Sequence, residues 1–406
     1  MTVAERIAPK TATEVSDCIA RCDAGGRKLL VVGGDTLAGM GFPPERADVR
    51  LEMTGLAGIV AHEPTDLTIA VQAGIPIQAV GNALGMHRQF VPFDAPRPQY
   101  ATVGGTLAAG WLGPRRHLYG RPRDYVIGST VALANGTIAR AGGMVVKNVA
   151  GYDLSRLYVG SFGTLGVFVQ INFKTIALPG RSRVFLARLP EGSRARALVQ
   201  LAGLDVRPSA AFWIDGFHQA IDGDDGDEGR IVVLLEGSEA LLERATRELR
   251  SALGRAGVPE TRIVDAGARE SFQRTIDAYT ATLGERSITY RLHQFPEKAE
   301  AVVRALRECA RGFELRCESI VDVMNGDLVA RISDLDAHAL GTKIEQFDEA
   351  LHAELPDARV IAGEHPQRPC LRVWGQDPPA IAKMRALKAR FDPHRTLNPG
   401  RFVGGI

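Results

Sequence analysis

The feature that most constrains this chain is a glycine-punctuated stretch, Lys147 to Thr175, that leads directly into a strand pattern. Glycines stand at positions 160, 163 and 166, and apolar residues then occupy alternate positions from Val167 to Phe173. Alternation with a period of two is typical of a half-buried β-strand. Glycines before such a strand remove side chains where a backbone must approach a ligand closely, and they permit a positive φ. The stretch therefore predicts a close-approach loop that enters a strand.

Composition and cysteine usage limit the class of protein. A chain of 406 residues, 45% hydrophobic and 24% charged, is typical of a globular protein with about two or three domains. The formal net charge of +2 does not mark nucleic acid as a partner. The five cysteines include no Cys-x-x-Cys pair, so we expect no disulfide framework and no metal site. Without a signal-like start or a long apolar run, the expected location is the cytoplasm, with no integral membrane segment.

A second glycine turn follows the first strand pattern. The segment KLLVV, which ends at Val32, reads as a buried strand, and it runs into Gly33, Gly34, Asp35 and Thr36. Successive N–H groups in such a turn form the nest geometry that holds phosphate oxygens. The spacing fits neither the Walker A motif nor the dinucleotide fingerprint, and a plain tight turn is the alternative interpretation. At Gly34 we expect valine to block both a positive φ and the approach of phosphate.

A third small-residue cluster lies within a Gly- and Pro-dense region. Thr102, Val103, Gly104 and Gly105 precede small residues at 108 to 110, which would let the start of a helix lie against a ligand. Farther along, residues 130–143 predict a hairpin that turns at Asn135-Gly136.

The second half of the chain has a different texture. From about Arg181, strand patterns alternate with charged amphipathic helices, which predicts a separate α+β domain. Near the end, a predicted helix at 379–391 is followed by FDPHRTLNPGR, whose two Pro-containing turns predict a compact tail that docks elsewhere. We expect domains at 1–180 and 181–360, followed by a docking segment at 361–406.

Taken together, these pieces resemble the vanillyl-alcohol-oxidase type (PCMH-type) FAD-binding family. The resemblance rests on the turn at 33–36, TVGG at 102–105, the stretch at 151–167 and the closing FDPHRTLNPGR. It is closest to FAD-binding subunits of bacterial glycolate oxidases, in which a GPRR segment (here 113–116) precedes a VKNVAGYD segment (here 146–153). The resemblance implies an α+β fold: a two-subdomain PCMH-type FAD-binding domain, an α+β cap domain, and a C-terminal tail that returns to the FAD domain.

The resemblance also implies FAD as the cofactor. The first turn would hold the pyrophosphate, the other glycine segments would lie along the rest of FAD, and the tail would return near the flavin. Many relatives tether FAD through a histidine where this chain has Asp35 and Thr36, so we expect FAD to bind non-covalently. The predicted FAD-binding residues are Val32, Gly33, Gly34, Asp35, Thr36, Pro92, Thr102, Val103, Gly104, Gly105, Ala108, Ala109, Gly160, Ser161, Gly163, Thr164, Gly166, Val167 and Asn398.

The implied chemistry is oxidation of a small 2-hydroxy acid, with hydride passing from Cα to flavin N5. Such a site needs a cationic clamp for the carboxylate and a base for the hydroxyl proton. Arg115, Arg116 and Lys147 are the candidate catalytic residues of the clamp; contacts with FAD phosphate, solvent or a neighbouring chain are the equal alternative. His365 is a candidate base, although a lone histidine in a Pro-rich loop is more often incidental.

One departure from the related dehydrogenases shapes the functional hypothesis. Those proteins carry an HGH...GDGN...H motif in their C-terminal half, and this sequence has no such cluster. The resemblance implies an arrangement in which a sister flavin subunit carries this motif and an iron–sulfur subunit takes the electrons onward. Any association of this chain with the inner membrane would come through such partners. We therefore expect an FAD-binding subunit that takes part in oxidising glycolate to glyoxylate. The alternatives are a free-standing FAD-dependent 2-hydroxy acid dehydrogenase of the D-lactate type and a non-catalytic flavin-bearing assembly subunit.

Overall fold

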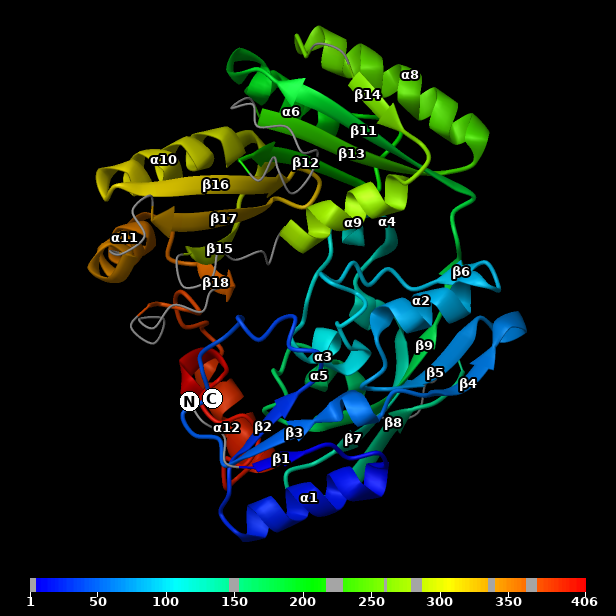
Figure 1. The fold of residues 1–406 in the computed structure, drawn as a ribbon, viewed down its shortest axis with the longest axis vertical. Coiled ribbons are helices and arrows are strands. Elements are labelled where there is room, and N and C mark those ends of the chain that lie inside the picture. Colours follow the sequence, from blue (N-terminus) through cyan, green and yellow to red (C-terminus); the bar gives the residue numbers. More distant parts are fainter. Residues whose placement is uncertain are drawn as a thin grey trace. The chain divides into compact units, whose positions relative to one another are not determined.

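The computed structural model describes residues 5–145, 153–216, 229–258, 261–278, 287–334, 340–362 and 371–406. It divides the chain into two compact units: Met1–Leu112, Arg121–Leu178 and Asp377–Ile406 form the first, and Gly113–Gly120 and Pro179–Gln376 form the second. The sequence-based boundaries lie at residues 180 and 360, and the short segment Gly113–Gly120 is assigned to the second unit. Helices and strands are mixed throughout both units, which confirms the predicted α+β class (Figure 1).

The first unit contains two β-sheets and a short strand pair (Figure 1). A parallel sheet has the order β1-β3-β2, an antiparallel sheet has the order β4-β5-β9-β7-β8, and β6 pairs with β10. Its strands are β1 Glu5–Ile7, β2 Leu29–Val32, β3 Val49–Glu52, β4 Ile59–Glu63, β5 Thr68–Gln72, β6 Gln89–Phe90, β7 Val126–Ala132, β8 Ile138–Gly142, β9 Val167–Lys174 and β10 Ile176–Ala177. Its helices are α1 Ala12–Ala24, α2 Ile77–Gly85, α3 Val103–Ala108, α5 Ser155–Tyr158 and α12 Ile381–Phe391.

Two local sequence patterns of the first unit are confirmed. The alternating apolar positions from Val167 to Phe173 are buried in β9, the central strand of the antiparallel sheet. A β-bulge in its pairing with β7 accompanies the burial of the neighbouring Phe168 as well. The predicted hairpin joins β7 to β8, and Gly136 at its turn has a φ of +84°.

The second unit is built on one antiparallel sheet with the order β14-β11-β13-β12-β16-β17-β15-β18. Its strands are β11 Arg181–Leu189, β12 Ala210–Asp215, β13 Gly229–Gly237, β14 Thr261–Val264, β15 Ser287–His293, β16 Leu315–Asp322, β17 Asp327–Asp334 and β18 Arg359–Ala362. Its helices are α4 Arg116–Tyr119, α6 Arg194–Ala202, α8 Glu239–Arg255, α9 Ala268–Ala278, α10 Ala299–Gly312 and α11 Leu340–Glu354. Short 3-10 turns in the two units lie at Met53–Gly55, Pro64–Asp66, Pro122–Tyr125, Glu191–Ser193, Pro296–Lys298 and Val403–Gly405.

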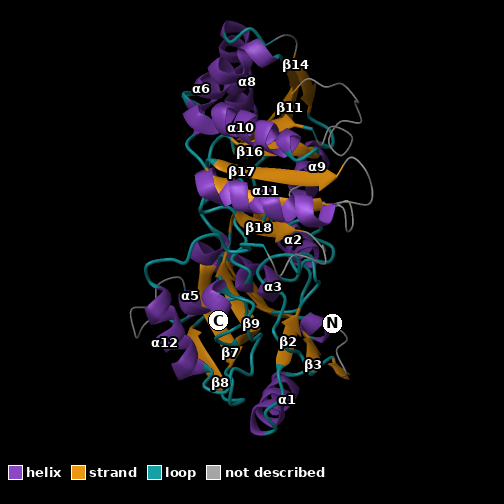
Figure 2. Ribbon diagram, turned by 90° about the vertical axis from the view of Figure 1, so that its left-hand side faces the viewer, coloured by secondary structure: helices purple, strands orange, loops and turns teal. Residues whose placement is uncertain are grey.

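Helices cover both faces of this sheet. Figures 1 and 2 show α6, α8, α10 and α11 along one face and α9 on the other. Two neighbouring residues of β12 mark the two sides: Phe212 packs on Phe272 of α9, with ring centroids 6.2 Å apart, and Trp213 lies under the Arg194 guanidinium of α6 at 5.5 Å. Burial on both faces explains why β12 reads AAFWID without alternation.

A buried polar network lies in the second unit around Asp348 of α11. Its carboxylate accepts hydrogen bonds from the Tyr290 hydroxyl at 2.9 Å and the Arg372 amide at 3.0 Å. His352 places Nδ1 2.8 Å from the Asp348 carbonyl oxygen and Nε2 3.1 Å from the Ala358 carbonyl oxygen, so only the imidazolium form can donate to both. Burial acts to lower the pKa of His352, but the bonds to Asp348 and Ala358 outweigh it and raise the pKa above its ordinary value. His352 is thus a core group of the second unit.

We expect His352 to make the stability of the second unit depend on pH. Because its pKa is raised on folding, its contribution is fully present below the unfolded value of about 6.5 and is lost as pH rises through the folded value. Replacing it, His352→Gln, should lower the free energy of unfolding by about 1–3 kcal/mol at pH 6 and by less at pH 9. Urea unfolding of both proteins at the two pH values tests this, and a difference independent of pH would contradict it.

Candidate cofactor-binding site

Four segments of the first unit surround a pocket: the turn after β2, the start of α3, the loop before β9 and the tail after α12. The pocket holds about 780 Å³ of empty space, part of it open to solvent. The structure therefore brings together most of the residues that the sequence assigned to one cofactor. Those that line the pocket are Val32, Gly33, Gly34, Asp35, Thr36, Thr102, Gly104, Gly105, Ala108, Ala109, Gly163, Gly166, Val167 and Asn398.

The turn after β2 presents a run of open backbone donors. The amide N–H groups of residues 33 to 37 donate no hydrogen bond to any part of the chain that the structure describes. Asp35, within the turn, has a φ of +56°, and a left-handed residue in such a turn is typical of anion-binding nests. Open donors grouped on one wall of a pocket suit the oxygens of a pyrophosphate.

Crowding, rather than backbone conformation, requires the glycines of this turn. A Cβ on Gly34 would overlap the Tyr100 carbonyl oxygen, and a Cβ on Gly33 would overlap the Thr102 hydroxyl. The expected positive φ at Gly34 is wrong, because the left-handed residue is Asp35. The two glycines instead allow the turn to lie directly on residues 100–102, which brings the turn and the start of α3 to the same pocket.

The start of α3 is anchored within the protein. Thr102 caps the helix, its hydroxyl accepting a hydrogen bond from the Gly105 amide at 3.2 Å. The Gly104 amide donates to the Ala73 carbonyl oxygen at 2.7 Å, and the Val103 amide donates to the Ile75 carbonyl oxygen at 3.0 Å. An anion bound at the start of a helix needs the free N–H groups of the first turn, and here those groups are already bonded within the protein. The segment lies against the pocket as expected, but the open donors for phosphate come from the turn at 33–37.

Arg401 supplies positive charge at the pocket. It lines the pocket wall, and its Nη2 donates to the Ala38 carbonyl oxygen at 3.2 Å and to the Met40 carbonyl oxygen at 2.9 Å. Burial lowers the pKa of Arg401 and the charge of Asp35 opposes this, while a guanidinium remains protonated at neutral pH. Asp35 also forms an ion pair with Arg50. The charge of Asp35 is thereby compensated, and the pocket favours an anionic ligand.

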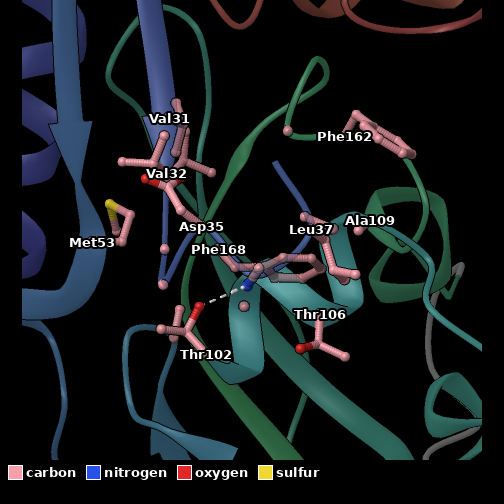
Figure 3. Close-up of a pocket in the computed structure, with 18 of the residues that line it drawn as sticks. Val31, Val32, Asp35, Leu37, Met53, Thr102, Thr106, Ala109, Phe162 and Phe168 are labelled. Carbon is pink, nitrogen blue, oxygen red and sulfur yellow. Dashed lines mark hydrogen bonds between the residues drawn. The ribbon is translucent and has the colours of Figure 1, made fainter. Parts of the chain in front are cut away.

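Further lining residues offer an unsatisfied hydroxyl and apolar surface. The Thr106 hydroxyl is buried and has no hydrogen-bond partner among the described residues, so a bound polar atom would offset its desolvation. Figure 3 shows Thr106 near Leu37 and Ala109, with Met53 on the opposite side of the pocket. Thr106 lies one helical turn beyond Thr102, a spacing that could have pointed to it. The lining residues that sequence reasoning missed are Val31, Leu37, Ala38, Met53, Ala73, Thr106, Phe162, Phe168 and Arg401.

The tail after α12 closes the pocket by hydrogen bonding alongside β2. The Leu29 amide donates to the Thr396 carbonyl oxygen at 2.8 Å, and the Asn398 amide donates to the Leu29 carbonyl oxygen at 2.9 Å. The side chain of Asn398 then bridges two walls. Its Oδ1 accepts from the Val31 amide at 2.8 Å, and its Nδ2 donates to the Phe162 carbonyl oxygen at 2.6 Å. The tail is therefore a structural wall of the pocket.

Five predicted FAD-binding residues are not among the lining residues of the pocket. They include Gly160, whose φ is +78° and whose amide donates to the Leu107 carbonyl oxygen, and Thr164, whose hydroxyl donates to the Ser161 carbonyl oxygen. Direct contact of these five with FAD stays a prediction. The set is Pro92, Val103, Gly160, Ser161 and Thr164.

The arginines of the GPRR segment are engaged within the second unit. Arg115 pairs with the buried Glu236 of β13 at 3.1 Å, and Arg116 pairs with the buried Asp327 of β17 at 2.8 Å. The Pro114 carbonyl oxygen accepts a hydrogen bond from the Asn325 side chain at 2.7 Å. These contacts anchor Gly113–Gly120 to the sheet of the second unit. A substrate-clamping role for the two arginines stays a prediction.

Lys147 and His365, the other candidate catalytic groups, lie outside the described residues. Among the residues that are described, no group of three or more His, Cys, Asp or Glu side chains is placed to hold a metal ion.

Comparison with known proteins gives the class of the site. Residues 4–142 match the family described as FAD binding domain, so the chain carries an FAD-binding domain of that family. Among solved structures, p-cresol methylhydroxylase superposes with a TM-score of 0.72 at 16% identity, over 98% of this chain and 88% of that one. An alkyldihydroxyacetonephosphate synthase superposes with a TM-score of 0.71 at 15% identity, over 97% of this chain and 75% of that one. At such identities the structures show the fold alone, and they confirm the predicted PCMH-type fold.

The curated relatives are named as oxidoreductases, and this chain spans less than two thirds of the length of most of them. Glycolate oxidase subunit GlcE of Escherichia coli is 36% identical over 224 residues, which are 54% of this chain and 59% of that protein. Glycolate oxidase subunit GlcD of Bacillus subtilis is 27% identical over 97% of this chain and 88% of that protein. D-lactate dehydrogenase [cytochrome] of Arabidopsis thaliana is 32% identical over 45% of this chain and 32% of that protein. The family match confirms the predicted FAD-binding family and FAD as cofactor, and the named activities of these relatives agree with the predicted class of FAD-dependent oxidoreductase.

None of the helices that the structure describes is long and apolar enough to cross a bilayer.

We predict that Gly34→Val abolishes FAD binding, because any Cβ at this position overlaps the Tyr100 carbonyl oxygen and displaces the turn. FAD content of the purified protein, read from the flavin absorbance, measures the effect. Gly81→Ala in α2 is the matched control, since a Cβ there meets nothing within 4 Å. A yellow Gly34→Val protein at full occupancy would show that the turn does not hold FAD.

We also predict that Arg401→Gln weakens FAD binding by about tenfold, since one charge-assisted hydrogen bond is worth about 1.4 kcal/mol or more. Titration of apoprotein by flavin fluorescence at low and high salt measures the effect, which should shrink as salt screens the charge. Arg390→Gln, at an exposed position of α12, is the matched control. Equal affinities of the two variants would remove Arg401 from the site.

Proposed function

We propose that this chain is the FAD-binding subunit of a glycolate oxidase-type complex. In this role it takes part in oxidising glycolate to glyoxylate, and electrons pass to a sister flavin subunit and an iron–sulfur subunit. The observation that carries the proposal is the 36% identity over 224 residues to a protein described as a glycolate oxidase subunit, GlcE. The GPRR and VKNVAGYD segments of the sequence support the same assignment. Such a subunit would work in the cytoplasm and reach the inner membrane only through its partners.

The contacts of the two candidate clamp arginines support a subunit over an independent dehydrogenase. Arg115 and Arg116 form ion pairs with carboxylates that are themselves buried, Glu236 and Asp327. Turning either guanidinium to a substrate would break an ion pair with a buried carboxylate, which costs free energy even at Asp327, where Arg291 is a second partner. The two arginines therefore suit a positioning role within the second unit.

Bound FAD supplies the acceptor for the two electrons of the hydroxy acid. The chain's own part is to hold the cofactor without a covalent bond. The open amides of residues 33–37 and the charge of Arg401 suit the pyrophosphate, and the Thr106 hydroxyl suits a polar atom of the cofactor. No histidine stands in the turn, where Asp35 and Thr36 lie.

A free-standing FAD-dependent 2-hydroxy acid dehydrogenase is the second candidate. The relatives that are named as dehydrogenases favour it: a D-2-hydroxyglutarate dehydrogenase of Xanthomonas citri is 30% identical over 45% of this chain. A D-lactate dehydrogenase is also among the relatives. The two candidates differ in one testable property, which is whether the purified chain alone oxidises a hydroxy acid.

We predict that the purified chain carries dissociable flavin and that its flavin band is not bleached when it is mixed anaerobically with glycolate or D-lactate. Adding the sister flavin subunit and the iron–sulfur subunit should restore glycolate-dependent bleaching. Absorbance near the flavin maximum follows both reactions, and release of FAD after acid precipitation tests the non-covalent bond.

Two outcomes would change the assignment. Bleaching by the lone chain would establish the free-standing dehydrogenase. A flavin that binds but is never reduced, even in the assembled complex, would leave a flavin-bearing assembly subunit.

A further inference from the structure

Lys388 is a buried lysine that is not among the lining residues of the pocket. Lys388 of α12 is 5% exposed, and its ammonium group donates hydrogen bonds to three oxygens. These are the Thr164 carbonyl oxygen at 2.8 Å, the Leu397 carbonyl oxygen at 3.0 Å and the Asp392 carboxylate at 2.5 Å. An ammonium group has three donors, so its hydrogen-bonding capacity is filled.

The partner of Lys388 organises the tail. Asp392 is fully buried, and its two carboxylate oxygens accept hydrogen bonds from the Thr396 and Leu397 amides, each at 2.8 Å. It therefore fixes the turn that follows α12 and sets the direction in which the chain continues to Asn398. A buried ion pair with every donor satisfied is stable only while both partners are in place.

The third acceptor of Lys388 belongs to a different wall. Thr164 lies between Gly163 and Gly166, both of which line the pocket. Its own amide and hydroxyl are bonded to the Ser161 carbonyl oxygen, so the loop is a tight turn whose remaining carbonyl points to Lys388. Lys388 thus joins the loop before β9 to the tail, and burial lowers its pKa while the charge of Asp392 opposes that effect.

We infer that Lys388 is a positioning residue for FAD, which couples the docking of the tail to the binding of the cofactor. This inference rests on the pocket being the FAD site. The loop and the tail each contribute lining residues, and the ammonium group is a hub that both walls share. Because coupling between two binding events is reciprocal, FAD should hold the tail in place to the same extent that the tail favours FAD.

The direct test compares Lys388→Met with Lys383→Met, an exposed lysine of the same helix. The double variant Lys388→Met/Asp392→Asn avoids an unpaired buried charge and guards against a folding failure of the single one. We expect both Lys388 variants to bind FAD at least tenfold more weakly than the wild type, and Lys383→Met to bind it normally. The rise in melting temperature on adding FAD should also be smaller in the Lys388 variants. A purely structural role would lower the melting temperatures of the apo and FAD-bound forms equally and would leave this rise unchanged.

A second measurement needs no variant. Trypsin cleavage after Arg395 and Arg401, followed by mass spectrometry, reports release of the tail in the wild type. FAD should slow this cleavage several-fold, and it should give much less protection in the Lys388 variants.

Two results would overturn the inference. One is wild-type FAD affinity in the folded Lys388 variants, and the other is a tail whose cleavage rate does not respond to FAD. Gly34→Val distinguishes a failure of this inference from a failure of the FAD site. If both Gly34→Val and the Lys388 variants retain FAD, the pocket is not the FAD site. If only Gly34→Val loses FAD, the pocket assignment stands and Lys388 has no positioning role.

Discussion

The pocket depends on the side-chain amide of Asn398. Its oxygen accepts from the Val31 amide, 367 residues away, and its nitrogen donates to the Phe162 carbonyl oxygen, 236 residues away. The same nitrogen occupies the space that a Cβ on Gly163 would need, which explains a glycine at that place in the loop. One planar group therefore sets the spacing of the β2 end, the loop before β9 and the tail. The turn at 33–37 presents its open amides to a pocket only because these three segments are held together.

Features that depend on local physics were predictable from the sequence. The alternation from Val167 to Phe173 gave β9 because period two is a property of the strand itself, and Asn135-Gly136 gave the hairpin because few residues accept a positive φ. The turn at 33–36 was located because glycines mark a close approach. The tail was expected to dock because its proline turns cannot continue a helix. The family resemblance then predicts FAD as the ligand that these segments share.

Features that depend on distant segments were not predictable. Gly34 is required by the Tyr100 carbonyl oxygen, and the amides at the start of α3 are taken by residues 73 and 75. Arg401 becomes part of the pocket only through the path of the tail. Arg115 reads as a free cation in the sequence, but its carboxylate partner Glu236 lies 121 residues farther along the chain. Each case is a contact across long sequence separation, which residue patterns do not carry.

The hydrogen bonds of the tail with β2 also determine when the protein can acquire its cofactor. Residues 396–398 pair alongside Leu29, yet the ribosome produces them only after the whole second unit has been made. Until then the parallel sheet of the first unit lacks this neighbour, and the pocket lacks a wall. With the proposed FAD site, flavin capture would be a late event in biogenesis, and a nascent chain stalled within the second unit would remain without flavin even though its glycine turn is already present.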